Sequence, residues 1–146
     1  MIYVKYKKLT ETAHEPTHGS RFAAGFDLYA DTTGEVTIFP GEYYIFKTGL
    51  AFEIPDGYFG GVYPRSGLST KHGLRLTNCV GVIDSDYRGD VTVPLYNDSD
   101  LAQVIAPHER IGQMIIQPIP DVILCKADKL SETDRGQKGF GSTGRL

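Results

Sequence analysis

The sequence predicts an all-β fold of the sandwich, barrel or jelly-roll type, and three observations lead to it. The 146 residues include 17 glycines and 8 prolines, spread along the whole length. Between them lie short runs of β-branched and aromatic residues, which favour strands. The prolines leave little room for long helices, because proline lacks the amide hydrogen that a helix interior needs.

Short apolar runs bounded by turn-forming residues are the predicted strands. They are Val36–Phe39, Tyr43–Phe46, Tyr58–Tyr63, Val91–Leu95, Ile111–Ile116 and Val122–Leu124. In the first run, Val36 and Ile38 alternate with Glu35 and Thr37, as expected for a strand with one buried face. The best helical segment is Gly67–Gly73, at most two turns long. Many short strands at roughly even spacing are typical of sandwiches, barrels and jelly rolls.

Bulk properties predict one globular domain and exclude several classes of protein. The length, with 40% hydrophobic and 23% charged residues, suits a single soluble domain. No apolar stretch is long enough to span a bilayer, and the first ten residues lack the apolar block of a secretory signal. The net charge is −3 and the basic residues are scattered, so we expect no nucleic-acid partner.

The cysteines and histidines predict a cytoplasmic protein without a metal centre of its own. Cys79 and Cys125 have no metal-type spacing and suit a reducing compartment, where we expect unpaired thiols in the core or at an interface. The four histidines are also not spaced as a metal site and are expected on the surface. They are His14, His18, His72 and His108.

The C-terminal segment differs from the rest of the chain in composition. Residues 131–146 have four glycines and only two sizeable apolar side chains, so they cannot bury enough surface to order themselves. We therefore expect a β domain over residues 1–130 and a flexible, glycine-rich tail over residues 131–146.

Two segments match known binding motifs, but the surrounding sequence excludes both binding sites. Gly139–Gly144 spells GxGxxG, but a dinucleotide site needs a strand before this motif and a helix after it. Asp84–Gly89 begins like a calcium-binding EF-hand loop. Positions five and twelve of that loop are Arg88 and Leu95, which cannot bind calcium.

Five segments, in order, carry the chemistry. The most informative is GVIDSDYRGD, residues 81–90, which lies between two apolar runs and predicts a hairpin with an acidic tip. The others are AAGFDLYA (23–30), PRSGLS (64–69), RIGQM (110–114) and RGQKGFGSTG (135–144). In this order and spacing, the set resembles the five motifs of the trimeric dUTPase family. The resemblance covers the chain from about residue 23 to residue 144.

The resemblance implies a distorted jelly-roll or β-barrel domain that forms a homotrimer with active sites shared between subunits. It also implies hydrolysis of dUTP to dUMP and pyrophosphate, which limits uracil incorporation into DNA and supplies dUMP for thymidylate synthesis. The main enzyme alternative is the related dCTP deaminase, whose chemistry needs a buried glutamate base that this sequence does not offer. A third possibility is a dUTP-loaded regulator that signals to a protein partner.

For the nucleoside end, the resemblance implies that Asp84 is the general base that deprotonates the attacking water. A carboxylate in this role typically contributes about 10²–10⁴ in rate. Tyr87 would lie against the deoxyribose and leave no room for a 2′-hydroxyl. Uracil would be bound by Asn78 and by the backbone of Gly81, Val82 and Ile83.

For the phosphates, the resemblance implies a cradle of Arg65, Ser66 and Gly67 at the start of the short helix. Gln113 lies within an apolar run, where burying a polar side chain costs free energy unless it is hydrogen-bonded. The resemblance implies that Gln113 orients the water and the α-phosphate. Asp27 is expected near Mg²⁺, through coordinated water. From the residues alone, Arg65 could instead be an ion-pair partner of Asp27 across a subunit boundary.

The tail would complete the site. Arg135 would reach the γ-phosphate and Phe140 would stack on uracil. The remaining tail residues that would wrap the phosphates are Gly141, Ser142 and Thr143. Lys138 departs from the family, which usually has glycine there, and it adds a positive charge beside the polyanion.

Overall fold

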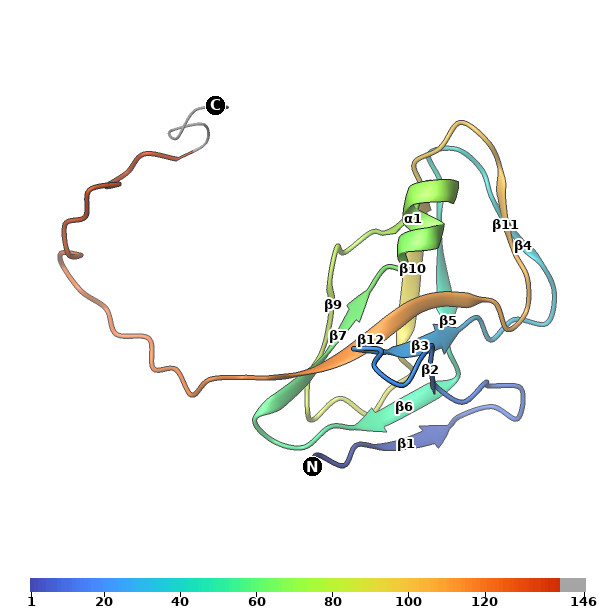
Figure 1. Cartoon of the computed structure of the whole chain (residues 1–146), viewed down its shortest axis with the longest axis horizontal. Coiled ribbons are helices and arrows are strands. Elements are labelled where there is room, and N and C mark those ends of the chain that lie inside the picture. The colour runs from blue at the N-terminus through green and yellow to red at the C-terminus, as the bar shows by residue number, and fades with distance from the viewer. Residues whose placement is uncertain (140–146) are drawn as a thin grey trace.

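A computed structural model describes residues 1–139 of the chain. Its body is built almost entirely from antiparallel strands, and the largest sheet has five of them in the order β2-β3-β12-β7-β9 (Figure 1). Their bounds are Thr17–His18 (β2), Phe26–Tyr29 (β3), Arg110–Pro118 (β12), Tyr58–Tyr63 (β7) and Gly81–Ile83 (β9).

Three smaller sheets close the body. The first has the order β5-β10-β8, with bounds Tyr43–Lys47, Thr92–Asn97 and Leu74–Leu76. The other two are pairs: β1 (Lys5–Lys8) with β6 (Leu50–Glu53), and β4 (Val36–Ile38) with β11 (Gln103–Ile105). Across the first pair, the hydrogen bond from Lys5 Nζ to Glu53 Oε1 (2.7 Å) lowers the pKa of the Glu53 carboxyl.

One apolar core lies between these sheets, because alternate residues of the strands point inward. Its largest fully buried side chains include Phe46, Leu28, Ile38, Leu95 and Met114. The arrangement is a jelly-roll-like β fold, as the sequence predicts. None of the helices in residues 1–139 is long and apolar enough to cross a membrane.

Several local predictions are confirmed. The strand Tyr58–Tyr63 has the predicted bounds, and helix α1 (Ser66–His72) lies within one residue of the predicted segment. In β4, Ile38 is buried while Thr37 is exposed, as the alternation predicts. Gly73 follows α1 with φ +65°, a left-handed conformation that glycine adopts without strain.

Two local predictions are wrong, and a third is wrong in part. Val122–Leu124 is not a strand: regular structure ends at Pro118, and residues 119–139 form an exposed arm that extends away from the body (Figure 1). The hairpin predicted over residues 81–90 is not formed, because β9 pairs with β7 whereas β10 pairs with β5 and β8. Both cysteines are exposed in the single chain, which excludes the core for them, whereas the expected location at an interface stays a prediction.

Candidate active site

A row of polar side chains crosses the five-stranded sheet. Asp27 on β3 lies opposite Gln113 on β12, and Gln113 in turn lies opposite Tyr63 on β7. On its other side Asp27 lies opposite Thr17, at the edge strand β2. Residues directly opposite one another in antiparallel strands share a face of the sheet. The register therefore places Asp27 and Gln113 side by side.

A β-bulge in β12 adds Arg110 to this row. In a regular strand, Arg110 and Gln113 would point to opposite faces, because their positions differ by an odd number. The register shifts between Arg110 and Gly112, so Arg110 lies opposite Tyr29 while Gly112 lies opposite Leu28. The extra residue reverses the alternation and turns Arg110 to the face that carries Asp27.

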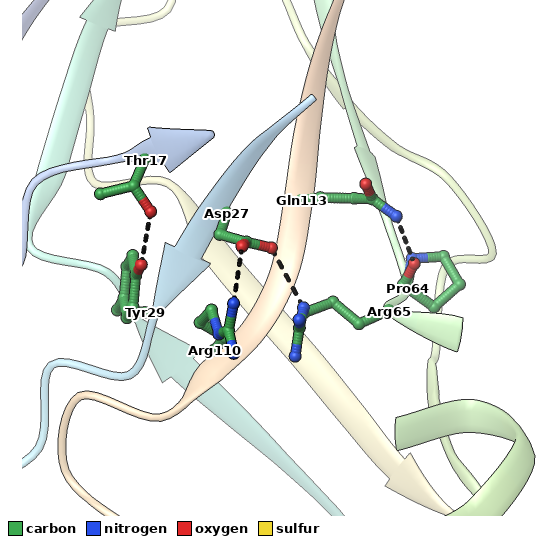
Figure 2. A network of polar contacts seen from close by, with 7 residues as sticks. All are labelled: Thr17, Asp27, Tyr29, Pro64, Arg65, Arg110 and Gln113. Atoms are coloured by element: carbon green, nitrogen blue, oxygen red, sulfur yellow. Dashed lines mark hydrogen bonds and ion pairs between the residues drawn. The ribbon is translucent and has the colours of Figure 1, made fainter. Parts of the chain in front are cut away.

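Asp27 forms ion pairs with two arginines (Figure 2). Arg65 Nε donates to Asp27 Oδ1 over 3.0 Å, and Arg110 Nη1 donates to Asp27 Oδ2 over 3.4 Å. The Asp27 side chain is only 10% exposed, against 29% for Arg65 and 48% for Arg110. The pair of Asp27 with Arg65 therefore forms within one chain, and the sequence-based alternative of a pair across a subunit boundary is wrong.

These residues line an open cavity of about 360 Å³, here called the arginine cavity. Its lining residues are Gly19, Ser20, Ala23, Gly25, Asp27, Arg65, Ser66, Gly67, Arg110 and Gln113. Two arginines and one aspartate give the lining a formal charge of +1, which suits an anion. At Gly67, a side chain would meet nothing within 4 Å, so open space adjoins its backbone.

Gln113 is held at the edge of this cavity by its own amide group. Its Nε2 donates to the carbonyl oxygen of Pro64 over 3.1 Å, and the side chain is partly buried (Figure 2). Because Nε2 is engaged, the side-chain oxygen Oε1 is left as an acceptor. An acceptor beside an anion site is suited to orient a water molecule.

The wall formed by residues 19–25 is a part of the site that the sequence did not assign. A Cβ atom at Gly25 would come within 2.9 Å of the Met114 carbonyl oxygen, so only glycine allows this close packing against β12. The partnership of Arg110 with Asp27 was also not expected. Gly25 and Asp27 belong to the first motif and Arg110 to the fourth, but the sequence does not show that these two motifs are neighbours. Only the pairing of β3 with β12 brings them together.

The segment Gly81–Asp90, here called the acidic loop, forms a separate group of predicted site residues. The Tyr87 amide donates to the Asp84 carbonyl oxygen over 3.2 Å and closes a turn at the tip of the loop. The Tyr87 hydroxyl donates to the Asp90 carbonyl oxygen over 3.1 Å, and a side chain at Gly89 would strike the Tyr87 ring. The ring is thus held in one place, while Asp84 is exposed.

Asn78 lies at the other end of β9. A Cβ atom at Gly81 would be 3.2 Å from Asn78 Nδ2, so glycine lets the amide lie close to the β9 backbone. Between them, the Val80 amide donates to the Asn78 carbonyl oxygen over 2.5 Å, and Cys79 has φ +54°. Val82 on β9 is 60% exposed. Asn78 and the β9 backbone are therefore accessible, as binding residues must be.

Within one chain, the acidic loop and the arginine cavity lie apart. Strand β9 runs antiparallel to β7 with Ile83 opposite Gly60, so Asp84, the next residue, comes level with Phe59 near the beginning of β7. Arg65 follows the other end of the same strand. At about 3.3 Å per residue, the six steps from Phe59 to Arg65 span roughly 20 Å. No residue of the acidic loop lines the arginine cavity.

The tail is described only in part. Arg135 is exposed, and its Nε donates to the Lys138 carbonyl oxygen over 3.2 Å in a short turn where Gly136 has φ +52°. The other predicted tail residues lie outside the described part of the chain. They are Phe140, Gly141, Ser142 and Thr143.

The described side chains do not fit a metal centre held by protein ligands. Among residues 1–139, no three His, Cys, Asp or Glu side chains are grouped to hold a metal ion. Asp27, the predicted residue, already accepts from a guanidinium at each carboxylate oxygen. The four histidines are all exposed, as predicted.

Comparisons with known proteins agree with this geometry. A family model described as dUTPase matches residues 11–144. The chain is 46% identical over 143 residues to the deoxyuridine 5′-triphosphate nucleotidohydrolase of Syntrophotalea carbinolica, covering 98% of this chain and 97% of that relative.

Solved structures give the same answer for the fold. A variant of the Staphylococcus bacteriophage 80alpha dUTPase with dUpNHpp superposes with a TM-score of 0.87 at 29% identity, over 97% of this chain and 98% of that one. A variant of the dUTPase from phage phi11 of S. aureus, solved for the coordination of a structural Mg(II) ion, superposes with a TM-score of 0.76 at 25% identity, over 87% and 97%. The chain therefore belongs to the dUTPase family.

Proposed function

We propose that the chain hydrolyses dUTP to dUMP and pyrophosphate by attack of water on the α-phosphorus. The observation that carries the proposal is the arginine cavity, where two guanidiniums and a preset amide line one anion site. The water oxygen bonds to the α-phosphorus and its proton passes to a carboxylate. The bond from the α-phosphorus to the bridging oxygen breaks, and pyrophosphate leaves.

The arginine cavity would take the triphosphate. Arg65 and Arg110 supply planar sets of N–H donors that match phosphate oxygens, and the open space at Gly67 lets a phosphate approach the backbone. Gln113 would orient the attacking water through its free Oε1. Arg135 and the tail residues 140–143 would close over the phosphates and the base, with Phe140 stacked on uracil.

The acidic loop would take the nucleoside. Asp84 would act as the general base. The ring of Tyr87, whose hydroxyl donates to the Asp90 carbonyl oxygen, would lie against the deoxyribose and exclude a 2′-hydroxyl. Asn78 and the β9 backbone would bond the polar edge of uracil. A site built to bond the polar edge of one pyrimidine can discriminate against another pyrimidine by a factor of up to about 10⁴ in kcat/KM. The buried polar groups of the site are left unpaired when the wrong base binds.

These two groups would meet only when copies of the chain assemble. Gln113 lies opposite Tyr63, four residues along β7 from the level of Asp84, so roughly 13 Å along the strand direction separates the two backbones. One water molecule cannot form hydrogen bonds to both side chains over such a separation. We therefore infer an assembly in which the acidic loop of one copy faces the arginine cavity of the next, and the family resemblance implies that this assembly is a homotrimer. The exposed side chains of Val122, Ile123 and Leu124 on the arm also favour contact with another copy.

Mixing two inactive variants tests the shared site. Asp84→Asn and Arg65→Gln should each be nearly inactive as homotrimers. Co-refolded in equal amounts, they should regain about a quarter of the wild-type activity, because one site in three of each mixed trimer receives both intact parts. If the two residues served one site within a chain, mixed trimers verified by native mass would stay inactive.

Mg²⁺ is the metal that we propose for the reaction, carried on the triphosphate rather than in a protein cage. Magnesium keeps several of its waters and commonly binds substrate phosphates. When bound, it would neutralise charge on the departing pyrophosphate. Arg65 and Arg110 would position the triphosphate that carries the metal, and Gln113 would position the attacking water.

The decisive experiment is to incubate the protein with each deoxynucleotide and with UTP, and to assay pyrophosphate. Mg²⁺-dependent release should be far faster from dUTP than from dCTP, dTTP or UTP. Release of ammonia from dCTP would point instead to a deaminase, and tight dUTP binding without turnover would point to a regulator. With turnover established, the expected roles are to limit uracil in DNA and to supply dUMP.

A further inference from the structure

The side chain of Arg88 closes the tip of the acidic loop. Its Nη1 donates to the carbonyl oxygen of Ser85 over 2.6 Å and to that of Tyr87 over 3.0 Å. The Tyr87 amide, in turn, donates to the carbonyl oxygen of Asp84 over 3.2 Å. One guanidinium nitrogen therefore holds together the turn that carries Asp84 and Tyr87, the two loop residues to which the proposed reaction assigns roles.

Other elements hold the two ends of the loop but not its tip. At one end, β9 pairs with β7 as far as Ile83, and at the other end Asp90 Oδ1 accepts from the Gly49 amide over 3.0 Å. Between these ends, no hydrogen bond joins residues 84–89 to another element of the described residues 1–139. Carbonyl oxygens in such a turn have no partner strand, so a side chain or solvent must satisfy them. Here one guanidinium satisfies two of them.

Arg88 also lies close to the body of the chain. The pKa of the Glu53 carboxyl on β6 is lowered first by its hydrogen bond with Lys5 and further by the charge of Arg88. The three side chains line one cavity. A guanidinium is planar and rigid, so its bonds to the loop and its attraction to Glu53 restrain the same group from two sides.

These contacts are separate from the proposed phosphate site of the same chain. Arg88 does not line the arginine cavity, and its hydrogen bonds go to backbone atoms of its own loop. The contacts therefore determine the shape of the loop, and all of them are made within one chain.

We propose that Arg88 is a positioning residue that presets the acidic loop, so that Asp84 and Tyr87 are already oriented when the nucleotide binds. The inference rests on the proposed function for the roles of Asp84 and Tyr87. Arg88 acts through the backbone carbonyl oxygens of the loop and does not itself contact the substrate. A preset loop avoids the loss of conformational entropy that ordering it on binding would cost.

Arg88→Gln tests the effect on catalysis, because the shorter, uncharged glutamine cannot replace a guanidinium that bridges two carbonyl oxygens. We expect kcat for dUTP to fall roughly 10–100-fold, the scale of a small misplacement of reacting groups. Arg88→Lys should recover much of the loss, because an ammonium group also has several donors. An unchanged kcat in Arg88→Gln, or no recovery in Arg88→Lys, would overturn the proposal.

Arg75→Gln is the matched control. Arg75 is also exposed, its Nε pairs with Asp98 over 3.0 Å, and its Nη1 donates to a backbone carbonyl oxygen, that of Leu76. It lies on β8, outside the acidic loop, so its loss should leave turnover unchanged. Equal losses in the two variants would refute a specific role of Arg88.

Binding of inorganic triphosphate in excess EDTA separates positioning from direct phosphate contact. This binding would use the arginine cavity and requires neither the loop nor turnover. Arg88→Gln should leave the affinity for triphosphate unchanged, whereas the affinity for dUMP should fall because the loop would bind the nucleoside. A loss of triphosphate affinity would show that Arg88 binds phosphate in a neighbouring copy, and would contradict the proposal.

Hydrogen exchange tests the loop itself. In the ligand-free wild-type protein, the Tyr87 amide should exchange about tenfold more slowly than in an unstructured peptide, because it is bonded to Asp84. Arg88→Gln should remove this protection, and Arg75→Gln should keep it. An unprotected Tyr87 amide in the wild-type protein would show that the loop is not preset. Because this measurement needs no dUTP, failure of the proposed hydrolysis remains distinguishable from failure of the positioning role.

Discussion

The side-chain amide of Gln113 donates to the carbonyl oxygen of Pro64 over 3.1 Å, which fixes the direction of the whole amide group at the edge of the arginine cavity. The bond joins the strand β12 to the residue just before Arg65. It thereby couples the group proposed to orient water to the group proposed to bind phosphate.

Gln113→Glu should break this relationship. A carboxylate cannot donate to Pro64 and would face both a carbonyl oxygen and the incoming phosphates. We expect turnover to fall by roughly 10²-fold, comparable to the loss of one oriented group at a reaction centre. The matched control is Gln117→Glu on the same strand, which can still accept from the Tyr63 hydroxyl and should keep its turnover. Equal losses in both variants would indicate general damage to β12.

Asp84→Asn should remove most turnover, by about 10² or more, while dUTP still binds. The amide keeps the shape of the side chain but cannot take a proton at neutral pH. Single-turnover kinetics and calorimetric dUTP binding would measure the two effects separately. Near-normal turnover would show that another group is the base.

Deleting residues 131–146 should leave the domain folded, because the described residues 131–139 are all exposed and bury nothing. Turnover should nevertheless fall sharply through the loss of Arg135 and the closing segment. Circular dichroism melts and pyrophosphate release would test the two statements together. A large drop in melting temperature would assign the tail a structural role instead.

Substitutions at Cys79 should change the free energy of unfolding according to how easily the new residue adopts a left-handed backbone conformation. Its φ of +54° is a left-handed conformation, which costs an L-residue about 1–2 kcal/mol and a β-branched residue more. Cys79→Gly should therefore stabilise the protein by about 1 kcal/mol, and Cys79→Val should destabilise it. Chemical denaturation at one fixed protein concentration would measure both. The reverse order would mean that the thiol makes a contact that outweighs the backbone strain.

The five motifs could be predicted from the sequence, but not how they meet in space. Arg65 and Gln113 were expected at the phosphates and Asp27 near Mg²⁺, and the structure brings all three side chains to one cavity. The ion pairs of Asp27 were not predictable in detail, because they depend on the pairing of β3 with β12 and on a bulge at Gly112.

Errors arose where a local pattern does not specify the partner strand. The turn signal at Asp84–Tyr87 was real, yet the flanking strands β9 and β10 joined different sheets, and local composition carries no information about this choice. Similarly, Val122–Leu124 has strand-forming residues but pairs with no strand among residues 1–139. Strand propensity is expressed only when a sheet edge is available.

The exposed arm would make the residues proposed to close the site, Arg135 and residues 140–143, a ligand tethered to the β domain. Arg135 lies seventeen positions beyond Pro118, the end of β12. Fully extended they reach roughly 55–60 Å, and as a random coil about 20–25 Å, a distance that spans neighbouring copies in an assembly. Such a tether keeps Arg135 at an effective concentration in the millimolar range. Weak contacts would therefore suffice to close the proposed site, and the same weakness would let it reopen and release pyrophosphate.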